Sequence, residues 1–292
     1  MEKVKVITHR GLDPSKQHYF VESSLEAFCD QLNRGYGLEF DLQPAADGSI
    51  VIIHDSNLKR ISSGSDTRQI RQVNADEILA MRFAGCRLTT LPALLSEIVK
   101  KQTKGQVSAL HLKHSAQDKV LLDHTLSHLK EARLEQLIVF DVELDTARFL
   151  KKQLLGLRLA PSVAHPYDIK RFNEVVGGTL MSVEEAIANR DLFDWVWLDE
   201  WDLDDEKGKK KSLYNEQVFR TLREAGLKIA VVSPELHGSS PGLLGGEAHP
   251  DAQTHDRLMK RIEEIITMKP DAICTDYPDE VRALAEKEFF SK

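Results

Sequence analysis

The chain has 292 residues, 41% hydrophobic and 29% charged, a composition typical of a soluble globular protein. This length suffices for one (β/α)₈ barrel of about 250 residues with an insertion. The net charge of -7 argues against a nucleic-acid partner, which needs a basic face. A small anionic substrate stays compatible with this charge, because a few local cations or a metal ion can reverse the field inside a pocket.

The cysteine content and the length of the apolar runs indicate in which cellular compartment the protein resides. The three cysteines, Cys29, Cys86 and Cys274, form no CxxC pair, so we expect free thiols rather than a disulfide framework. The N-terminal segment has no long apolar run, and no segment approaches the roughly 18 apolar residues of a membrane helix. We therefore expect no signal peptide, no membrane anchor and a cytoplasmic location, while the sequence gives no indication of the oligomeric state.

Short apolar runs alternate with helical patterns along the chain. After a first strand at residues 4–8, Leu25, Phe28 and Leu32 recur at helical spacing and predict a helix over residues 23–34. Seven further strands are predicted, at residues 37–42, 107–112, 137–141, 157–163, 195–198, 228–233 and 272–275.

The turn signal Asp47-Gly48 and the apolar run at residues 49–54 predict a hairpin-like excursion, and residues 55–106 are less regular. Elsewhere, strands that alternate with helices imply right-handed crossovers and a parallel sheet. Eight such units favour the α/β class and closure into a (β/α)₈ TIM barrel. We expect one domain over residues 1–292; the alternative fold is a doubly wound open sheet.

Function in a barrel gathers at the C-terminal ends of the strands. Glu39 and Asp41 lie two residues apart on strand two, so both point to one face and Phe40 to the other. Two crowded carboxylates repel each other unless a proton or cation intervenes, and hard divalent cations bind such oxygens. The same alternation turns His111 and Lys113 to one face of strand three.

His9 and Arg10 follow strand one, and His54 ends the apolar run of the insertion. Each feature alone is weak, because a lone histidine is more often a hydrogen-bonded structural group than a catalyst. A single Glu-x-Asp pair is more often a surface feature. Two histidines, an arginine, a lysine and a carboxylate pair at strand ends in one half of a barrel are hard to explain by stability alone and indicate a catalytic site.

These residues resemble the glycerophosphodiester phosphodiesterase family, whose pattern runs from His-Arg-Gly through Glu-x-Asp and an Asp-Gly turn to a His-Asp pair. The chain matches this pattern in order and spacing over residues 4–64, and from 65 to 270 mainly in its rhythm of strands and helices. The matching segments are HRG (9–11), ESSLEAF (22–28), GLEFDLQPAADGSIVIIHD (37–55), Leu58, Arg60, Gly64 and TDYPDE (275–280).

The resemblance implies a barrel with an insertion after strand two, here about residues 43–106. It also implies metal-dependent hydrolysis of a small-molecule phosphodiester to an alcohol and a phosphomonoester, either glycerol phosphate or a related polyol or sugar phosphate. It implies His9 and His54 as the general acid and base, and Arg10 as a ligand of the phosphate oxygens. It also implies Glu39 and Asp41 as ligands of a divalent metal ion, Mg²⁺ or Ca²⁺.

The first departure from the family pattern lies on strand three, where the family has Glu-x-Lys and this chain reads HLK at 111–113. Lys113 is kept, and we expect it to stabilise the phosphate oxygens. If His111 is the metal ligand, imidazole shifts the preference toward Mn²⁺ or Zn²⁺. Alternatively, Asp199 or Glu200 on strand six supplies the missing oxygen.

The second departure lies on strand seven, where a family tryptophan-threonine pair is replaced by VVSPELHG at 231–238. The glycine-rich loop at 238–250 is either a plain surface loop or one that closes on substrate. Trp201 either packs in the core or stacks on a sugar. A polar pocket wall, which would suit a sugar- or polyol-linked diester, is predicted from His165, Glu200, Glu235 and His237.

Two alternatives to a hydrolase stay open at this point. A cyclising phosphodiesterase, resembling the phosphoinositide-specific phospholipase C group, would use a substrate hydroxyl to attack phosphorus. A phosphodiester-binding protein without catalysis is suggested by the loss of the strand-three glutamate. The retained histidines, arginine, lysine and carboxylate pair favour the enzyme.

Overall fold

The computed structural model describes residues 3–132, 134–201, 204, 207–210, 212–239 and 249–290. Its strands are β1 (Lys5–His9), β2 (Gly37–Pro44), β3 (Ile50–Ile52), β4 (Thr89–Thr90), β5 (Ser108–His111), β6 (Leu137–Phe140), β7 (Arg158–Ala160), β8 (Ser162–Val163), β9 (Leu180–Met181), β10 (Trp195–Leu198), β11 (Lys228–Val232) and β12 (Ala272–Thr275). Its α-helices are α1 (Leu25–Asn33), α2 (Ala75–Ala80), α3 (Leu91–Lys101), α4 (Lys119–Leu129), α5 (Leu144–Gln153), α6 (Pro166–Phe172), α7 (Val183–Ala188), α8 (Glu216–Glu224), α9 (Leu236–Ser239), α10 (His255–Thr267) and α11 (Pro278–Phe290).

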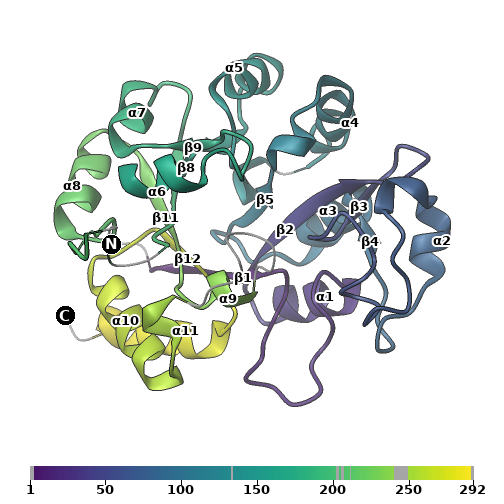
Figure 1. Cartoon of the computed structure of the whole chain (residues 1–292), viewed down its shortest axis with the longest axis horizontal. Coiled ribbons are helices and arrows are strands. Elements are labelled where there is room, and N and C mark those ends of the chain that lie inside the picture. Colours follow the sequence, from purple (N-terminus) through teal and green to yellow (C-terminus); the bar gives the residue numbers. More distant parts are fainter. Residues whose placement is uncertain are drawn as a thin grey trace.

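The main sheet is parallel throughout, in the order β7-β6-β5-β2-β1-β12-β11-β10-β8-β9. β7 and β8 are one strand interrupted at Pro161, which has no amide hydrogen to donate to a neighbour. Since β7 pairs with β6 and β8 pairs with β10, the sheet closes on itself, and the helices surround it (Figure 1). The predicted (β/α)₈ barrel is confirmed, and the doubly wound alternative is wrong.

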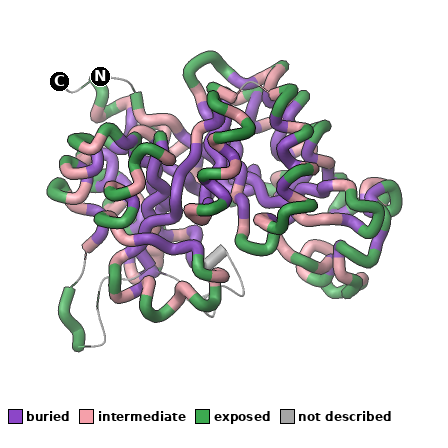
Figure 2. The backbone as a smooth tube through the Cα atoms, turned by 90° about the horizontal axis from the view of Figure 1, so that it is seen from above, coloured by how far each residue is buried: buried purple, intermediate pink, exposed green. Residues whose placement is uncertain are grey.

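Side-chain alternation along the strands divides the core into two layers. Ile7 and Ala109 lie in the apolar cluster inside the barrel, whereas Val6, Phe40 and Leu110 pack in the larger cluster between the sheet and the helices. Buried chain accordingly fills the middle of the molecule (Figure 2). The three cysteines are free thiols, as expected.

The chain leaves the barrel after β2 and returns at β5. β3 pairs antiparallel with β2, and β4 with β3, so the excursion starts as an extension of β2. It has a small core of its own, which includes Val51, Ile53 and Ile78, and α2 lies outside the ring of helices, at the right of Figure 1. His54 follows β3, so this insertion carries a predicted catalytic residue.

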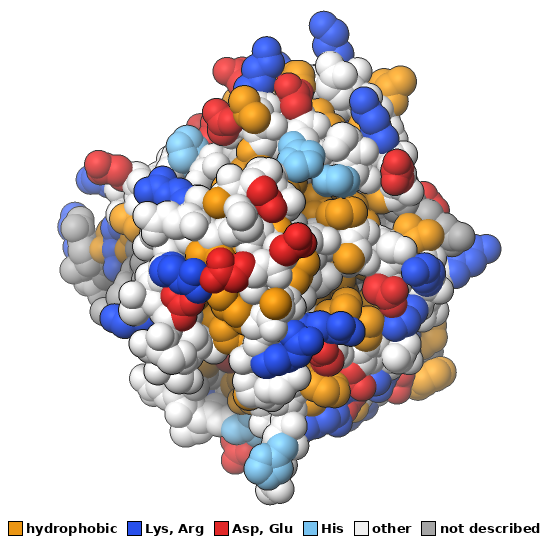
Figure 3. All heavy atoms as spheres, turned by 90° about the vertical axis from the view of Figure 1, so that its right-hand side faces the viewer, with side chains coloured by type: hydrophobic (Ala, Val, Ile, Leu, Met, Phe, Trp, Pro, Cys, Tyr) orange, Lys and Arg blue, Asp and Glu red, His pale blue; other side chains and the backbone are white. Residues whose placement is uncertain are grey.

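The surface beside the insertion carries both signs of charge. Lys and Arg side chains are interspersed with Asp and Glu side chains over the described part of this face (Figure 3). Among the helices that the structure describes, none combines the length and the apolar composition required to traverse a lipid bilayer.

Gly37 is required by the packing of β2 against β5, which gives a first prediction. A Cβ atom at this position would lie 1.9 Å from the Val107 carbonyl oxygen. We expect Gly37→Ala to lower the free energy of unfolding by about 1–3 kcal/mol or more, because backbone must move to admit the methyl group. Chemical denaturation measures this. Gly156→Ala is the matched control, since its Cβ would meet only the Leu134 side chain at 3.5 Å; an equal effect of both substitutions would contradict the packing argument.

Candidate active site

Strand register brings the predicted site residues together at one end of the barrel. His9, the last residue of β1, pairs with Glu39 on β2. Asp41 on β2 pairs in turn with His111, the last residue of β5, and Lys113 follows two residues later. Parallel strands place their C-terminal ends at the same edge, so these side chains share the barrel mouth.

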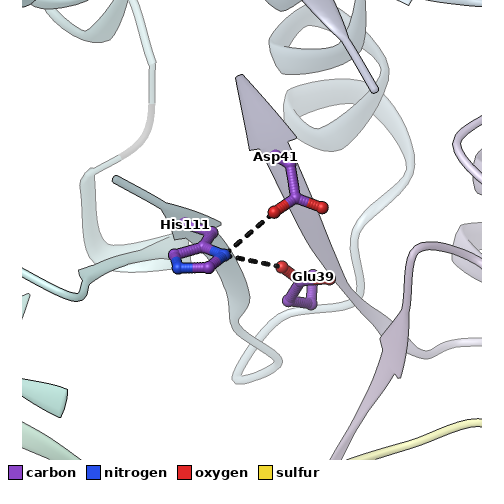
Figure 4. Close-up of side chains that lie close together, drawn as sticks. All are labelled: Glu39, Asp41 and His111. Atoms are coloured by element: carbon purple, nitrogen blue, oxygen red, sulfur yellow. Dashed lines mark hydrogen bonds and ion pairs between the residues drawn. The ribbon is translucent and has the colours of Figure 1, made fainter. Parts of the chain in front are cut away.

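Glu39, Asp41 and His111 form a cluster with the composition of a metal site. One ligand atom from each lies within 4.8 Å of the others. Nδ1 of His111 is 2.9 Å from Asp41 Oδ1 and 3.9 Å from Glu39 Oε1, and the three side chains point toward one another from β2 and β5 (Figure 4). Two buried carboxylates and one imidazole are a donor set that suits a divalent cation.

Arg10 and Lys113 surround Asp41 with positive charge. Arg10 Nε lies 3.4 Å from Asp41 Oδ2, and its Nη1 donates to Glu22 at 3.2 Å. Lys113 Nζ lies 3.1 Å from Asp41 Oδ1 and donates to the His54 carbonyl oxygen at 2.9 Å. Arg10 is buried with φ of 52°, in the left-handed region. Both cations are therefore held beside the carboxylate pair rather than extended into solvent.

The two carboxylates differ in their electrostatic surroundings. Burial and the charge of Asp41 raise the pKa of Glu39 to about 8. Burial opposes ionisation of Asp41 too, but the charges of Lys113 and Arg10 and the hydrogen bond from His111 hold its pKa well below the usual range. The metal-free site therefore keeps one carboxylate firmly ionised and the other close to its neutral form.

His9 and His54 are each oriented by a carboxylate. Nδ1 of His9 lies 2.9 Å from Asp276 Oδ1, and Nδ1 of His54 lies 2.7 Å from Asp55 Oδ1. Burial lowers the pKa of His9 well below its usual value and that of His54 to about 4. Both imidazoles are thus neutral at physiological pH in the metal-free protein, with Nδ1 directed to its carboxylate and Nε2 left for other partners.

Two carboxylates that reach this site from strands distant in the sequence were not assigned a role from the sequence. Asp276 follows β12 and contacts His9; Asp141 follows β6 and lies 3.3 Å from Nε2 of His111. The available signal was their place at the end of a predicted strand (Asp141) or directly after one (Asp276), where barrel side chains reach the mouth. Their partners lie far away in the sequence, so only the closed barrel identifies the contacts.

One cavity of about 920 Å³ connects the site to the opposite side of the barrel mouth. Among the predicted site residues it is lined by His9, Arg10, Glu39, His54, His111 and Lys113. The opposite wall is mainly apolar, with Phe172, Leu180 and Trp201 beside Asp199 and His237. The cavity is large enough for a phosphodiester whose two substituents occupy its two ends.

The predicted polar wall is wrong for three of its four residues, and only His237 lines the cavity. His165 caps α6 by accepting from the Tyr167 amide. Glu200 accepts from the amides of residues 213 and 214 and pairs with Arg261 at 2.9 Å. Glu235 accepts from the Thr275 hydroxyl and the Asp276 amide at the end of β12. Each of these groups satisfies backbone or core hydrogen bonds instead of facing substrate.

The same contacts bear on the alternatives raised for strand six, and Trp201, which lines the cavity, stays open to both of its predicted roles. Asp199 lies 3.1 Å from Nε2 of His237, and neither it nor Glu200 belongs to the cluster of Glu39, Asp41 and His111. Trp201 is buried and packs against Phe172 and His237. Most of the glycine-rich loop predicted at 238–250 lies outside the described residues.

Glu235 gives a second prediction. Burial and the charge of Asp276 raise its pKa to about 7. The folded protein thus binds more protons than the unfolded chain between about pH 4.5 and 7, so this group makes stability fall as pH rises through that window. We expect Glu235→Gln, which keeps the acceptor oxygen, to remove that fall and to raise stability at pH 8 by on the order of 2 kcal/mol. Denaturant titrations at pH 5 and 8 measure this; an unchanged difference between the two pH values would contradict it.

Solved structures with the same fold come from several bacteria. A glycerophosphoryl diester phosphodiesterase from Parabacteroides distasonis gives a TM-score of 0.66 at 16% identity, over 98% of this chain and 87% of that one. An Oleispira antarctica phosphodiesterase, solved with the product sn-glycerol-3-phosphate, gives a TM-score of 0.64 at 16% identity, over 97% of each chain. At these identities the likeness shows the fold.

Sequence comparison reaches further. A glycerophosphodiester phosphodiesterase from Caldanaerobacter subterraneus subsp. tengcongensis is 33% identical over 96 residues, a match that spans 30% of this chain and 38% of that relative. The pattern of the glycerophosphoryl diester phosphodiesterase family matches residues 9–280, from the last residue of β1 to the first turn of α11. The chain therefore belongs to the glycerophosphoryl diester phosphodiesterase family.

Proposed function

We propose that this protein is a metal-dependent hydrolase of small-molecule glycerophosphodiesters, which releases an alcohol and glycerol phosphate or a related polyol or sugar phosphate. The observation that carries the proposal is the shared cavity, which is lined by two carboxylate-held histidines, two cations, and Glu39 and His111 of the metal-type cluster. Family membership and the product named for the Oleispira antarctica structure support it.

The anionic phosphate would occupy the cavity beside Arg10 and Lys113. Their positive charges would stabilise the non-bridging oxygens, on which charge accumulates as the phosphorus atom is attacked. Both side chains are held in place by Asp41 before substrate arrives. Less reorganisation is then needed when the reaction begins.

His9 and His54 would divide the two proton transfers. One imidazole accepts a proton from the attacking water as its oxygen bonds to phosphorus, and the other donates a proton to the alcohol oxygen as that bond to phosphorus breaks. The phosphodiester charge raises the pKa of a nearby imidazole, so one of the two can carry the required proton near neutral pH. Asp276 and Asp55 keep the rings oriented meanwhile.

Glu39, Asp41 and His111 would hold the divalent ion. Their donor set fits it, and bound there it would stabilise phosphoryl charge as a Lewis acid. Mg²⁺ or Ca²⁺ suits the two carboxylates, while the imidazole of His111 favours Mn²⁺ or Zn²⁺. We propose Mn²⁺ as the ion that supports the highest activity, because it accepts both oxygen and imidazole ligands.

Hydrolysis in H₂¹⁸O tests the reaction type. With glycerophosphocholine and Mn²⁺, we expect glycerol phosphate that contains one ¹⁸O atom and free choline, because water is the nucleophile. A cyclic phosphate without ¹⁸O would replace this proposal by the cyclising reaction. If the diester binds saturably but no metal ion yields a product, the protein is a non-catalytic binding protein instead.

A further inference from the structure

The imidazole of His111 is held on three sides. Its ring stacks on Phe140 with centroids 4.5 Å apart and planes 13° from parallel, and Phe140 stacks on Trp197 at 4.0 Å and 14°. Nδ1 faces the two β2 carboxylates, with Asp41 Oδ1 at 2.9 Å. Nε2 faces the opposite way, 3.3 Å from Asp141 Oδ2. A side chain fixed by a ring stack and two opposed polar contacts is set in one orientation.

Asp141 adopts an uncommon backbone conformation to reach this contact. Its φ is 66°, in the left-handed region that non-glycine residues rarely enter. The amide side chain of Gln117 donates to its carbonyl oxygen at 2.8 Å and to that of Leu112 at 2.9 Å, which ties this turn to the end of β5. The side chain of Asp141 is only 9% exposed. A strained and nearly buried acid directed at one imidazole nitrogen points to a functional role.

We propose that Asp141 is a positioning residue that makes His111 a metal ligand through Nδ1. An imidazole that binds a metal ion through one nitrogen keeps its single proton on the other, so an acceptor at Nε2 favours the proton there and the lone pair on Nδ1. Nδ1 is the nitrogen that faces Glu39 and Asp41 (Figure 4). Histidines that bind metals generally donate their second ring N–H to a carboxylate or carbonyl group in this manner. The inference rests on the metal site of the proposed function.

The same contact offsets a loss of charge. A cluster with one imidazole and two carboxylates carries less negative charge than one with three carboxylates. The Asp141 carboxylate contacts the far side of the imidazole and so makes it a stronger donor to a cation. The site would thus combine the nitrogen ligand His111 with a third carboxylate, that of Asp141, which contacts the imidazole rather than the ion.

A structural ion pair is the alternative explanation for the Asp141 contact. In that case, removing Asp141 changes stability but leaves metal affinity and the ligating nitrogen unaltered. In the positioning role, the effect of Asp141 on metal affinity depends on an imidazole at position 111. Replacing His111 by glutamate would leave Asp141 opposite a second carboxylate, where it repels rather than orients. A double-mutant cycle therefore separates the two explanations.

The experiment measures Mn²⁺ affinity of the full-length protein from the free-ion signal in electron paramagnetic resonance, without substrate. We expect Asp141→Ala to weaken Mn²⁺ binding about 10–100-fold in the wild-type background. In the His111→Glu background the same change should leave the affinity unaltered or improve it. Asp199→Ala is the matched control, a cavity carboxylate paired with His237 rather than His111, and should keep wild-type affinity.

A second readout identifies the ligating atom. In Zn²⁺-loaded protein with ¹⁵N-labelled histidine, we expect His111 to bind through Nδ1 and to keep a proton on Nε2, and Asp141→Ala to broaden or lose that proton signal. Unchanged affinity in Asp141→Ala, equal losses in both backgrounds, or ligation through Nε2 would each overturn the inference. Normal Mn²⁺ binding with this pattern but no hydrolysis of any diester would instead overturn only the proposed function.

Discussion

Replacing His9 or His54 by alanine should lower kcat for glycerophosphodiester hydrolysis by about 10²–10⁴-fold. Each imidazole would carry one of the two proton transfers, and water replaces a positioned acid or base poorly. Both side chains line the cavity but lie outside the metal-type cluster. We therefore expect Mn²⁺ affinity to stay within a few-fold of the wild-type value in both variants. Steady-state kinetics and Mn²⁺ titration of the same samples measure the two effects.

His255→Ala is the matched control for these substitutions. This histidine is exposed on α10, pairs with Glu280 and does not line the cavity, so its loss should leave kcat unchanged. Wild-type activity in either His9→Ala or His54→Ala would remove that residue from the proton-transfer pair. If a variant loses activity only because it no longer binds Mn²⁺, the replaced histidine belongs to the metal site instead.

Asp41→Asn should destabilise the metal-free protein far more than Glu39→Gln does. Asp41 is the shared partner of Arg10, Lys113 and His111, so its neutralisation removes a buried counter-charge from all three groups at once. Such a loss costs about 3–5 kcal/mol. Glu39 accepts from the Arg10 amide at 3.3 Å, a contact that the oxygen of glutamine can keep. Denaturant titration of both variants with excess chelator measures the difference.

The same pair of variants tests the metal site. Adding Mn²⁺ stabilises the wild type by mass action if the ion binds the folded form. Both Asp41→Asn and Glu39→Gln should lose most of this stabilisation, because each removes one anionic ligand from the cluster. If the two variants were equally stable without metal, Asp41 would not be the counter-charge that stabilises its neighbours. Full stabilisation by Mn²⁺ in either variant would exclude that residue as a ligand.

The barrel could be predicted from local sequence patterns, because buried parallel strands are short apolar runs that alternate regularly with helices along the chain. The one predicted strand at 157–163 is divided at Pro161, yet its two parts still pair with the expected neighbours and close the barrel. Period-two alternation also placed Glu39 and Asp41 opposite Phe40 in the sequence, and the structure has Phe40 in the outer core.

Local sequence patterns do not predict the side-chain contacts between strands that are distant in the sequence. Asp276 reaches His9 because β12 pairs with β1, and Asp141 reaches His111 because β6 pairs with β5. Neither contact has a local signature. The predicted polar wall failed for a related reason, since Glu200 bonds to backbone amides that pattern alone does not locate.

The most direct test of the account is metal-dependent hydrolysis of bis(p-nitrophenyl) phosphate. The protein is first treated with chelator, and Mg²⁺, Ca²⁺, Mn²⁺ and Zn²⁺ are then added back separately. We expect no hydrolysis after chelation and recovery of hydrolysis when divalent ions are added, with the highest rate in Mn²⁺. Full activity in the chelated protein, or no activity with any of the four ions, would contradict it.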